Sequence, residues 1–263
     1  MNLLEKIISK RKQTVNQLKS IIPVQAWEMM PLFKKEILSL KESLIFEDGW
    51  GIIAEFKRAS PSKGIINDKA DIFDVVFSYD QNGASGISIL TEPEFFQGNN
   101  DDILSVAESL TTPILRKDFI IDEYQVIESK AIGADAILLI AAALTKQETK
   151  RFSALAHELG LEVLLEIHNE SELDWISSDI DMVGVNNRNL KTFEVDINVS
   201  LNLITKIPTD KLAISESGIS DVDTIVTLHK AGFRGFLIGE TFMRQPDPGK
   251  AFKTLQTSLK GGL

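Results

Sequence analysis

The stretch that decides the fold is Ile52–Ile65, with the sequence IIAEFKRASPSKGI. It begins as an apolar strand in which Glu55 and Lys57 are two residues apart. Because strand side chains alternate between the two faces of a sheet, this spacing directs both charges to the same face. A polar turn from Ser60 to Gly64 follows, with hydroxyl groups and backbone N–H groups to offer. An acid, a base and an anion-friendly loop at the C-terminal end of one strand predict an active site.

Further short apolar strands follow along the chain at similar intervals. The expected strands are GIIAEF (51–56), GISIL (86–90), PILRK (113–117), ADAILLI (134–140), LEVLLEI (161–167), DMVGVN (181–186), KLAISE (211–216) and GFLIG (235–239). When helices alternate with such strands, the result is a series of parallel βαβ units with right-handed crossovers. This number of units predicts an α/β protein with a closed (β/α)8 TIM barrel rather than an open doubly wound sheet.

The segments between these strands carry the signals of helix starts and stops. The clearest are DIFDVVFSYDQNG (71–83), DEYQVIESKAIG (122–133), TKQETKRFSALAHELG (145–160) and SDVDTIVTLHKAG (220–232). Each begins at Asp, Thr or Ser, which suit N-caps, and ends in a glycine of the kind that follows helices. The chain contains no GxGxxG or GxxxxGK[ST] fingerprint, which further disfavours an open nucleotide-binding sheet.

A helical pattern precedes the barrel. LLEKIISKRKQTVNQL and LFKKEILSLKESL predict two helices, joined by a link from Ile22 to Pro31. Two interpretations stay open: a cap over the bottom of the barrel, or a lid that carries Trp27 or Phe33 toward the site. We expect a single domain over 1–263, in which residues 1–48 are an N-terminal helical extension and residues 49–263 are the barrel.

Composition and charge exclude several classes of function. The 263 residues include no cysteine, so a disulfide framework, a thiol nucleophile and a thiolate metal site are excluded. The net charge of −10 argues against a nucleic-acid binder but allows a small anionic ligand, which responds to the local field of a pocket. The longest apolar run, Ala136 to Leu144, is about half a membrane span, and the N-terminus lacks the apolar centre of a signal peptide. We therefore expect a cytoplasmic, monomeric protein that binds neither membranes nor nucleic acid.

Polar residues follow several strands at the inward-facing positions, where barrel enzymes carry their chemistry. They are Glu55 and Lys57 on the first strand, Lys117 on the third, Glu166 on the fifth, Asn186 and then Arg188 on the sixth, and Glu216 on the seventh. A single charge at a strand end is more often solvated than catalytic. A buried unpaired charge costs several kcal/mol, however, so a cluster must be mutually paired or serve a ligand. Paired lysines and glutamates can hold an acid and a base with different pKa values.

Glycine-containing turns follow the last two strands, at Ser217-Gly218 and Gly239-Glu240. Ordinary turn chemistry would explain each one. Their paired location favours a phosphate site, because backbone N–H groups at helix starts bind phosphate after these strands in many barrels.

The histidines and phenylalanines permit weaker inferences. His157 and His229 fall on helices, and His168 follows Glu166 without a second histidine or a cysteine nearby, so we expect no metal site. Phe95, Phe96 and Phe119 belong either to the core or to the walls of a pocket for an aromatic ligand.

Eight stretches, in order, resemble the indole-3-glycerol phosphate synthase family of tryptophan biosynthesis. They are IIAEFKRASPSKG, ISILTEPEFFQG, PILRKDFIID, ADAILLIAAAL, LEVLLEIHNE, VGVNNRNL, ISESGIS and FLIGETFMR. The resemblance implies a lyase that cyclises 1-(2-carboxyphenylamino)-1-deoxyribulose 5-phosphate to indole-3-glycerol phosphate. Carbon dioxide and water are lost, and neither metal nor cofactor is needed.

The resemblance also implies a role for each site residue. Lys117 would be the general acid that protonates the substrate carbonyl, and Glu166 the general acid/base of later proton transfers. Lys57 would hold the substrate carboxylate and assist dehydration. The remaining implied roles are orientation by Glu55 and Glu216, a hydroxyl contact from Asn186, a carboxylate contact from Arg188, a phosphate site of Ser60, Ser217, Gly218, Gly239 and Glu240, and an aromatic pocket of Pro61, Phe96, Phe119 and Leu190.

Three other functions are possible for a barrel of this kind. A Schiff-base aldolase of the same fold would use Lys117 or Lys57 as its nucleophile. The neighbouring isomerase of the pathway relies on a cysteine base, which this chain lacks. A non-catalytic phospho-ligand sensor on the same barrel would not need the complete set of strand-end charges.

Overall fold

The computed structural model describes residues 2–45 and 49–261. Met1 and residues 46–48 of the expected extension, and residues 262–263, lie outside this range. At the centre is a closed barrel of parallel strands in the order β1-β10-β9-β8-β7-β6-β5-β4. These strands are β1 (Ile52–Phe56), β4 (Gly86–Leu90), β5 (Ile114–Lys117), β6 (Ala136–Ile140), β7 (Glu162–Ile167), β8 (Met182–Asn186), β9 (Leu212–Glu216) and β10 (Gly235–Ile238). The (β/α)8 prediction is confirmed.

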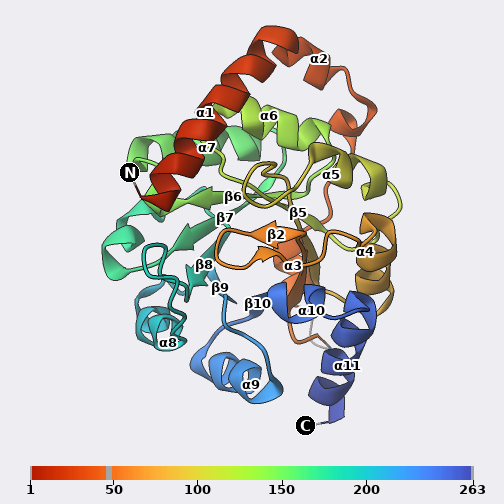
Figure 1. The fold of residues 1–263 in the computed structure, drawn as a ribbon. Coiled ribbons are helices and arrows are strands. Elements are labelled where there is room, and N and C mark those ends of the chain that lie inside the picture. The colour runs from red at the N-terminus through yellow and green to blue at the C-terminus, as the bar shows by residue number, and fades with distance from the viewer. Residues whose placement is uncertain (1, 46–48, 262–263) are drawn as a thin grey trace.

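Helices surround the strands, as Figure 1 shows. They are α4 (Ile72–Gln81), α5 (Asn100–Val106), α6 (Glu123–Ala131), α7 (Lys146–Glu158), α8 (Asn198–Leu203), α9 (Val222–Ala231), α10 (Glu240–Met243) and α11 (Pro248–Gly261), with 3-10 turns η2 (Ala141–Ala143), η3 (Glu170–Trp175) and η4 (Ile204–Lys206). Gly133, one of the predicted terminating glycines, has a φ of +93°, and a Cβ there would lie 2.7 Å from the Cβ of Ala107. Among the described residues, no helix combines the length and apolar character needed to cross a membrane.

The barrel has two apolar layers because strand side chains alternate in direction. Leu115, Leu138 and Leu164 belong to the inner cluster, whereas Val163 and Leu165 pack outward against the helices. The same alternation brings the polar ends of strands into the mouth of the barrel. The register aligns Glu166 with the last residue of β6 and Asn186 with Glu216.

The extension is less regular than the sequence predicts. It consists of α1 (Leu3–Ile21), α2 (Val24–Glu28), the 3-10 turn η1 (Pro31–Lys34) and α3 (Leu40–Leu44). The prediction of one continuous helix over LFKKEILSLKESL is wrong. Tertiary hydrogen bonds replace the helical ones there: Leu38 N–H donates to Asp135 Oδ1, and Lys41 N–H donates to Glu162 Oε2.

The cap interpretation describes one part of the extension, whereas the lid interpretation is wrong for Trp27 and Phe33. Leu40 and Leu44 of α3 lie in the inner cluster beside Leu115, so α3 caps the bottom of the barrel. Helices α1 and α2 lie instead against α6 (Figure 1). Trp27 packs edge-on against Tyr124 of α6 at 6.2 Å, and Phe33 packs against the outer core, so neither is carried toward the site.

Candidate active site

A cavity of about 500 Å³ lies at the mouth of the barrel, among the C-terminal ends of the strands and the loops that follow them. Every site residue that the sequence predicts lines this one cavity. They are Glu55, Lys57, Ser60, Pro61, Phe96, Lys117, Phe119, Glu166, Asn186, Arg188, Leu190, Glu216, Ser217, Gly218, Gly239 and Glu240. The parity of the strands explains part of the convergence, because Glu55, Lys117, Glu166 and Glu216 each stand two residues after an apolar residue of the inner cluster.

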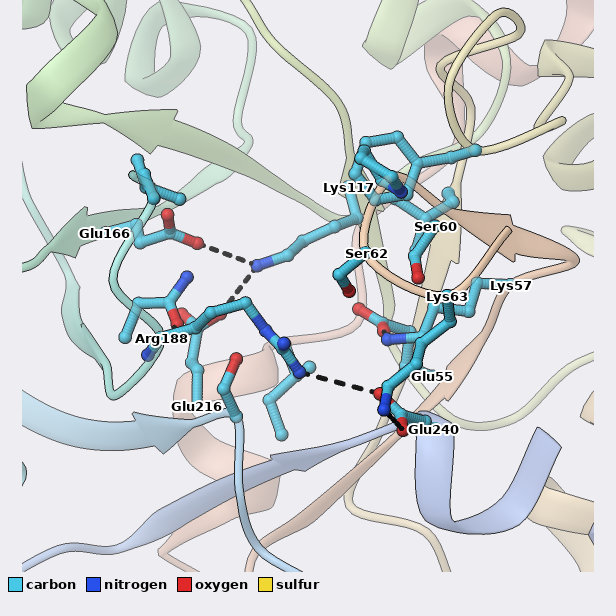
Figure 2. A pocket seen from close by; sticks show the side chains of 18 of the residues that line it. Glu55, Lys57, Ser60, Ser62, Lys63, Lys117, Glu166, Arg188, Glu216 and Glu240 are labelled. Carbon is cyan, nitrogen blue, oxygen red and sulfur yellow. Dashed lines mark hydrogen bonds and ion pairs between the residues drawn. The ribbon is translucent and has the colours of Figure 1, made fainter. Parts of the chain in front are cut away.

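Lys117 lies between two carboxylates at the centre of the cavity, as Figure 2 shows. Its Nζ is 2.6 Å from Glu216 Oε2 and 3.0 Å from Glu166 Oε2. Glu216 Oε1 is buried and has no hydrogen-bond partner. Gly184 on β8 makes room for this carboxylate, since a Cβ there would lie 2.1 Å from Glu216 Oε1.

The pKa values of this group follow from burial and from the mixture of charges. Burial alone would lower the pKa of Lys117, but Glu216, Glu166 and Glu55 raise it, so the amine is held as an ammonium. Burial would raise the pKa of Glu166, yet Lys117 and His168 hold it below its usual range. Burial raises the pKa of Glu216 to about 7, and the repulsion of Glu166 and Glu55 adds to the effect of burial while Lys117 opposes it.

A second lysine–glutamate pair comes from β1 and the residue after it. Lys57 Nζ lies 2.8 Å from Glu55 Oε1, as their spacing in the sequence predicts. Ser88 on β4 donates to the other oxygen of Glu55 at 3.4 Å. Gly239 lies next to this carboxylate, and a Cβ at that position would be 2.5 Å from Glu55 Oε1.

One end of the cavity is formed by turns and cations. The Ser60 hydroxyl is buried without a hydrogen-bond partner. Ser217 and Gly218 both have a positive φ, and Gly239 is the N-cap residue of α10. Lys63 and Arg244, which the sequence analysis did not select, also line the cavity.

Glu240 lies between two cations at this end. Its carboxylate is 3.5 Å from Arg188 Nη2 and 3.8 Å from Lys63 Nζ (Figure 2). The backbone N–H of Arg188 is held by Asn186 Oδ1 at 3.0 Å. The guanidinium of Arg188 is therefore directed across the cavity mouth toward α10.

Another part of the cavity lining is apolar. The rings of Phe96 and Phe119 lie 6.1 Å apart, centre to centre, and Pro61 and Leu190 also line the wall. Phe95 does not line the cavity; its N–H donates to Glu92 Oε2. Leu3, Leu4 and Ile7 of α1 also line the cavity, so the extension contributes to the site through α1 rather than through Trp27 or Phe33. The sequence predicts the apolar face of α1, but it does not predict that this face lines the cavity.

The histidines lie where the sequence predicts, and His168 makes a further contact that the sequence does not predict. His157 is on α7 and pairs with Asp181, while His229 packs against Trp50. His168 lies 3.2 Å from Glu166 Oε1 and contacts a carboxylate that the sequence analysis did not select, Glu172. Over residues 2–45 and 49–261, no group of acidic, histidine or cysteine side chains is arranged to hold a metal ion.

Comparison with known proteins identifies the family. Residues 4–255 match the family model for indole-3-glycerol phosphate synthase. The chain belongs to the indole-3-glycerol phosphate synthase family. An indole-3-glycerol phosphate synthase of Bacteroides thetaiotaomicron is 49% identical, over 98% of each chain. One of Salinibacter ruber is 43% identical, over 99% of this chain and 97% of the relative.

More distant solved structures share the barrel. A tryptophan synthase alpha-subunit mutant from Pyrococcus furiosus superposes with a TM-score of 0.61 at 17% identity, covering 81% of this chain and 98% of that one. A 3-hexulose-6-phosphate synthase from Salmonella typhimurium gives a TM-score of 0.63 at 14% identity, covering 81% and 100%. At these identities the likeness concerns the fold alone.

Proposed function

We propose that this protein catalyses the ring closure of 1-(2-carboxyphenylamino)-1-deoxyribulose 5-phosphate to indole-3-glycerol phosphate in tryptophan biosynthesis. The observation that carries the proposal is the ammonium of Lys117, held between Glu166 and Glu216 in one cavity. Aromatic side chains and turns suited to phosphate line that same cavity. Membership of the family gives the reaction, and the geometry supports a role for each residue.

Lys117 is the general acid of the first step. The ring carbon that bears the carboxylate attacks the ketone carbon, and negative charge develops on the ketone oxygen. A positioned ammonium offsets that charge and donates a proton to the oxygen. Carbon dioxide then leaves, which restores the aromatic ring.

Glu166 and Lys57 serve the dehydration that follows. Loss of the new hydroxyl as water and loss of a proton complete the indole. Glu166, held in its ionised form by its neighbours, exchanges protons in these steps. Lys57 holds the substrate carboxylate before it leaves and then assists the departure of water. Glu55 and Glu216 orient the two lysines and the sugar hydroxyls.

The polar and the apolar residues of the cavity lining bind different parts of the substrate. Ser60, Ser217, Gly218, Gly239 and the backbone of Glu240 surround the phosphate. Asn186 contacts a hydroxyl group, and Arg188 pairs with the anthranilate carboxylate. Phe96, Phe119, Pro61 and Leu190 hold the anthranilate ring, with Leu3, Leu4 and Ile7 of α1 as additional contacts. Apolar walls supply binding free energy and exclude water from the reacting atoms.

The decisive experiment is incubation with the carboxyphenylamino deoxyribulose phosphate, without metal or cofactor, while indole fluorescence is followed. We expect turnover, and its absence would overturn the proposal. Borohydride added with substrate distinguishes the Schiff-base alternative, which requires a neutral lysine amine. Since the carboxylates around Lys117 raise its pKa, we expect no trapped adduct.

We further propose that the protein acts as a cytoplasmic monomer and folds as a single domain. Every side chain in the proposed mechanism comes from one chain, so the site is complete without a partner. Light scattering coupled to size-exclusion chromatography tests the oligomeric state. Calorimetry tests the domain, for which one cooperative unfolding transition is expected.

A further inference from the structure

The two oxygens of Glu166 face two different cations. Oε2 lies 3.0 Å from Lys117 Nζ, inside the cavity. Oε1 lies 3.2 Å from Nε2 of His168, which stands two residues further along, just after β7. His168 is 11% exposed and does not line the cavity, so it touches Glu166 from behind.

The opposite side of the His168 ring is also occupied by a carboxylate. Nδ1 lies 3.4 Å from Oε2 of Glu172, on η3. The titratable groups that contact this ring, among the described residues, are thus Glu166 from its own strand and Glu172 from the following turn. Burial would lower the pKa of His168, but these two carboxylates raise it to about 10.

A purely structural role does not require the imidazole ring. Glu172 already closes this turn by accepting the backbone N–H of His168 at 2.7 Å and the Asn169 side chain at 2.8 Å. The ring's Nε2 makes no well-directed hydrogen bond and is held near Glu166 by charge. The ring therefore adds only one long contact, from Nδ1 to Glu172, to this turn, but it is in direct contact with the general acid/base.

We propose that His168, anchored by Glu172, is a positioning residue that holds one oxygen of Glu166 and so orients the other toward Lys117 and the substrate. The inference rests on the proposed function, because it assigns a consequence to the proton transfers of Glu166. Without His168, the carboxylate can rotate, and its second oxygen loses the positive charge that favours the ionised form. His168 acts through Glu166 and has no contact with the substrate.

Two conservative variants separate the contacts of the ring. His168→Asn places an amide near the position of Nδ1, so it keeps the Glu172 side and loses the Glu166 side. His168→Gln reaches the position of Nε2 and keeps a neutral donor toward Glu166. We expect His168→Asn to lower kcat about tenfold to a hundredfold with KM nearly unchanged, the range found for partners that orient metal-ligating side chains. We expect His168→Gln to lower kcat less.

The pH profile is the measurement that a structural role would not change. Removing the imidazolium raises the pKa of Glu166, so the base form of Glu166 is lost at a higher pH. The acidic limb of kcat should therefore move to higher pH in His168→Asn relative to the wild type. The matched control is His157→Gln, a half-exposed histidine on α7, which should behave as the wild type. A kcat and an acidic limb in His168→Asn equal to those of the control would overturn the inference.

A second measurement requires only folded protein. The ring of His168, followed by NMR, should titrate well above the ordinary histidine range in the wild type, and its pKa should fall in Glu166→Gln. An ordinary pKa in the wild type would sink the pairing, whatever the kinetics. If the wild type shows no turnover but the NMR result holds, the proposed function fails while the pairing stands. If turnover is normal but His168 titrates ordinarily, the inference alone fails.

Discussion

Strand β5 carries two cations side by side, the buried Arg116 and the partly buried Lys117, which face opposite sides of the barrel wall. Arg116 points outward and is fully buried. All three nitrogens of its guanidinium donate hydrogen bonds, and the acceptors belong to Thr91, Asn100, Asp118, Gln125, Glu128 and Ser129. Lys117 points inward, contacts Glu166 and Glu216, and lines the cavity. One cation completes a network, and the other stands at an open site.

The difference separates structural charge from functional charge. Around Arg116, hydrogen bonds from several elements compensate for burial, so the network fixes helices α5 and α6 to the barrel. Around Lys117, the unpaired Glu216 Oε1 and the Ser60 hydroxyl lie in residues that line the cavity. Glu128 Oε1 is also unpaired, but Glu128 does not line the cavity. A ligand can satisfy only the groups at the mouth of the barrel.

Asp118, the next residue after Lys117, joins the outer network to the extension. Its Oδ2 accepts from Arg11 of α1 at 2.5 Å and from Thr91 at 2.6 Å. Burial would raise the pKa of Asp118, but Arg11 and Arg116 lower it. This buried pair holds α1 in the place from which its leucines reach the cavity.

The largest expected effect is the loss of turnover when Lys117, the inward cation, is removed. Lys117→Ala should lower kcat by roughly two to four decades, because it removes the general acid, and the protein should remain folded. Indole fluorescence measures the rate, and circular dichroism checks the fold. Lys253→Ala, on the exposed face of α11, is the control. Turnover near the wild-type rate would contradict the assignment.

The outward cation should show the reverse pattern. Arg116→Met should lower the free energy of unfolding by about 3–5 kcal/mol, since it leaves Glu128 buried without its cation and takes one of two cations from Asp118. Urea denaturation measures the change. Arg151→Met is the matched control, because its ion pair with Glu123 is half exposed and should contribute about 1 kcal/mol or less. Equal losses in the two variants would remove the distinction between buried and surface pairs.

Glu216→Gln tests the inward group through the pH dependence of the free energy of unfolding. The pKa of Glu216 is raised from 4.5 to about 7 in the folded protein, so its contribution favours folding below pH 4.5 and is lost as the pH rises through 7. In the variant, the free energy of unfolding should decline less as the pH rises. Above pH 7 it should exceed that of the wild type by about 0.5–2 kcal/mol, while turnover falls. Chemical denaturation between pH 4.5 and 8 tests this, with Glu42→Gln on the exposed face of α3 as control. A parallel pH dependence in Glu216→Gln and the wild type would refute the assignment.

The smallest effect is expected at the apolar wall. Leu4→Ser should raise KM less than tenfold with kcat almost unchanged, because Leu4 contributes part of one apolar contact to the bound ring. Steady-state kinetics measures both constants. Met29→Ser, at an 84% exposed position on the same extension, should change neither. A fall in kcat alone would place Leu4 outside the binding wall.

The fold and most of the candidate site could be predicted because both depend on local periodicity. Alternation along each strand assigned Glu55, Lys57 and Glu166 to the inner face without knowledge of any partner. Glycines such as Gly133 marked helix ends because their backbone conformation excludes a side chain. Local periodicity did not predict the second helix of the extension correctly. Asp135 and Glu162, about a hundred residues away, supply the hydrogen bonds that interrupt this helix.

The sequence alone determined which side chains face the mouth of the barrel, because the direction of a side chain follows from its position along a strand. Only the tertiary structure decided which of them meet: Lys117 with Glu216, Glu166 with His168, and α1 with the apolar wall. These contacts depend on the closure and register of the barrel, which bring together residues from distant strands. A local pattern carries the direction of a side chain, but the distance between two side chains is a property of the whole fold.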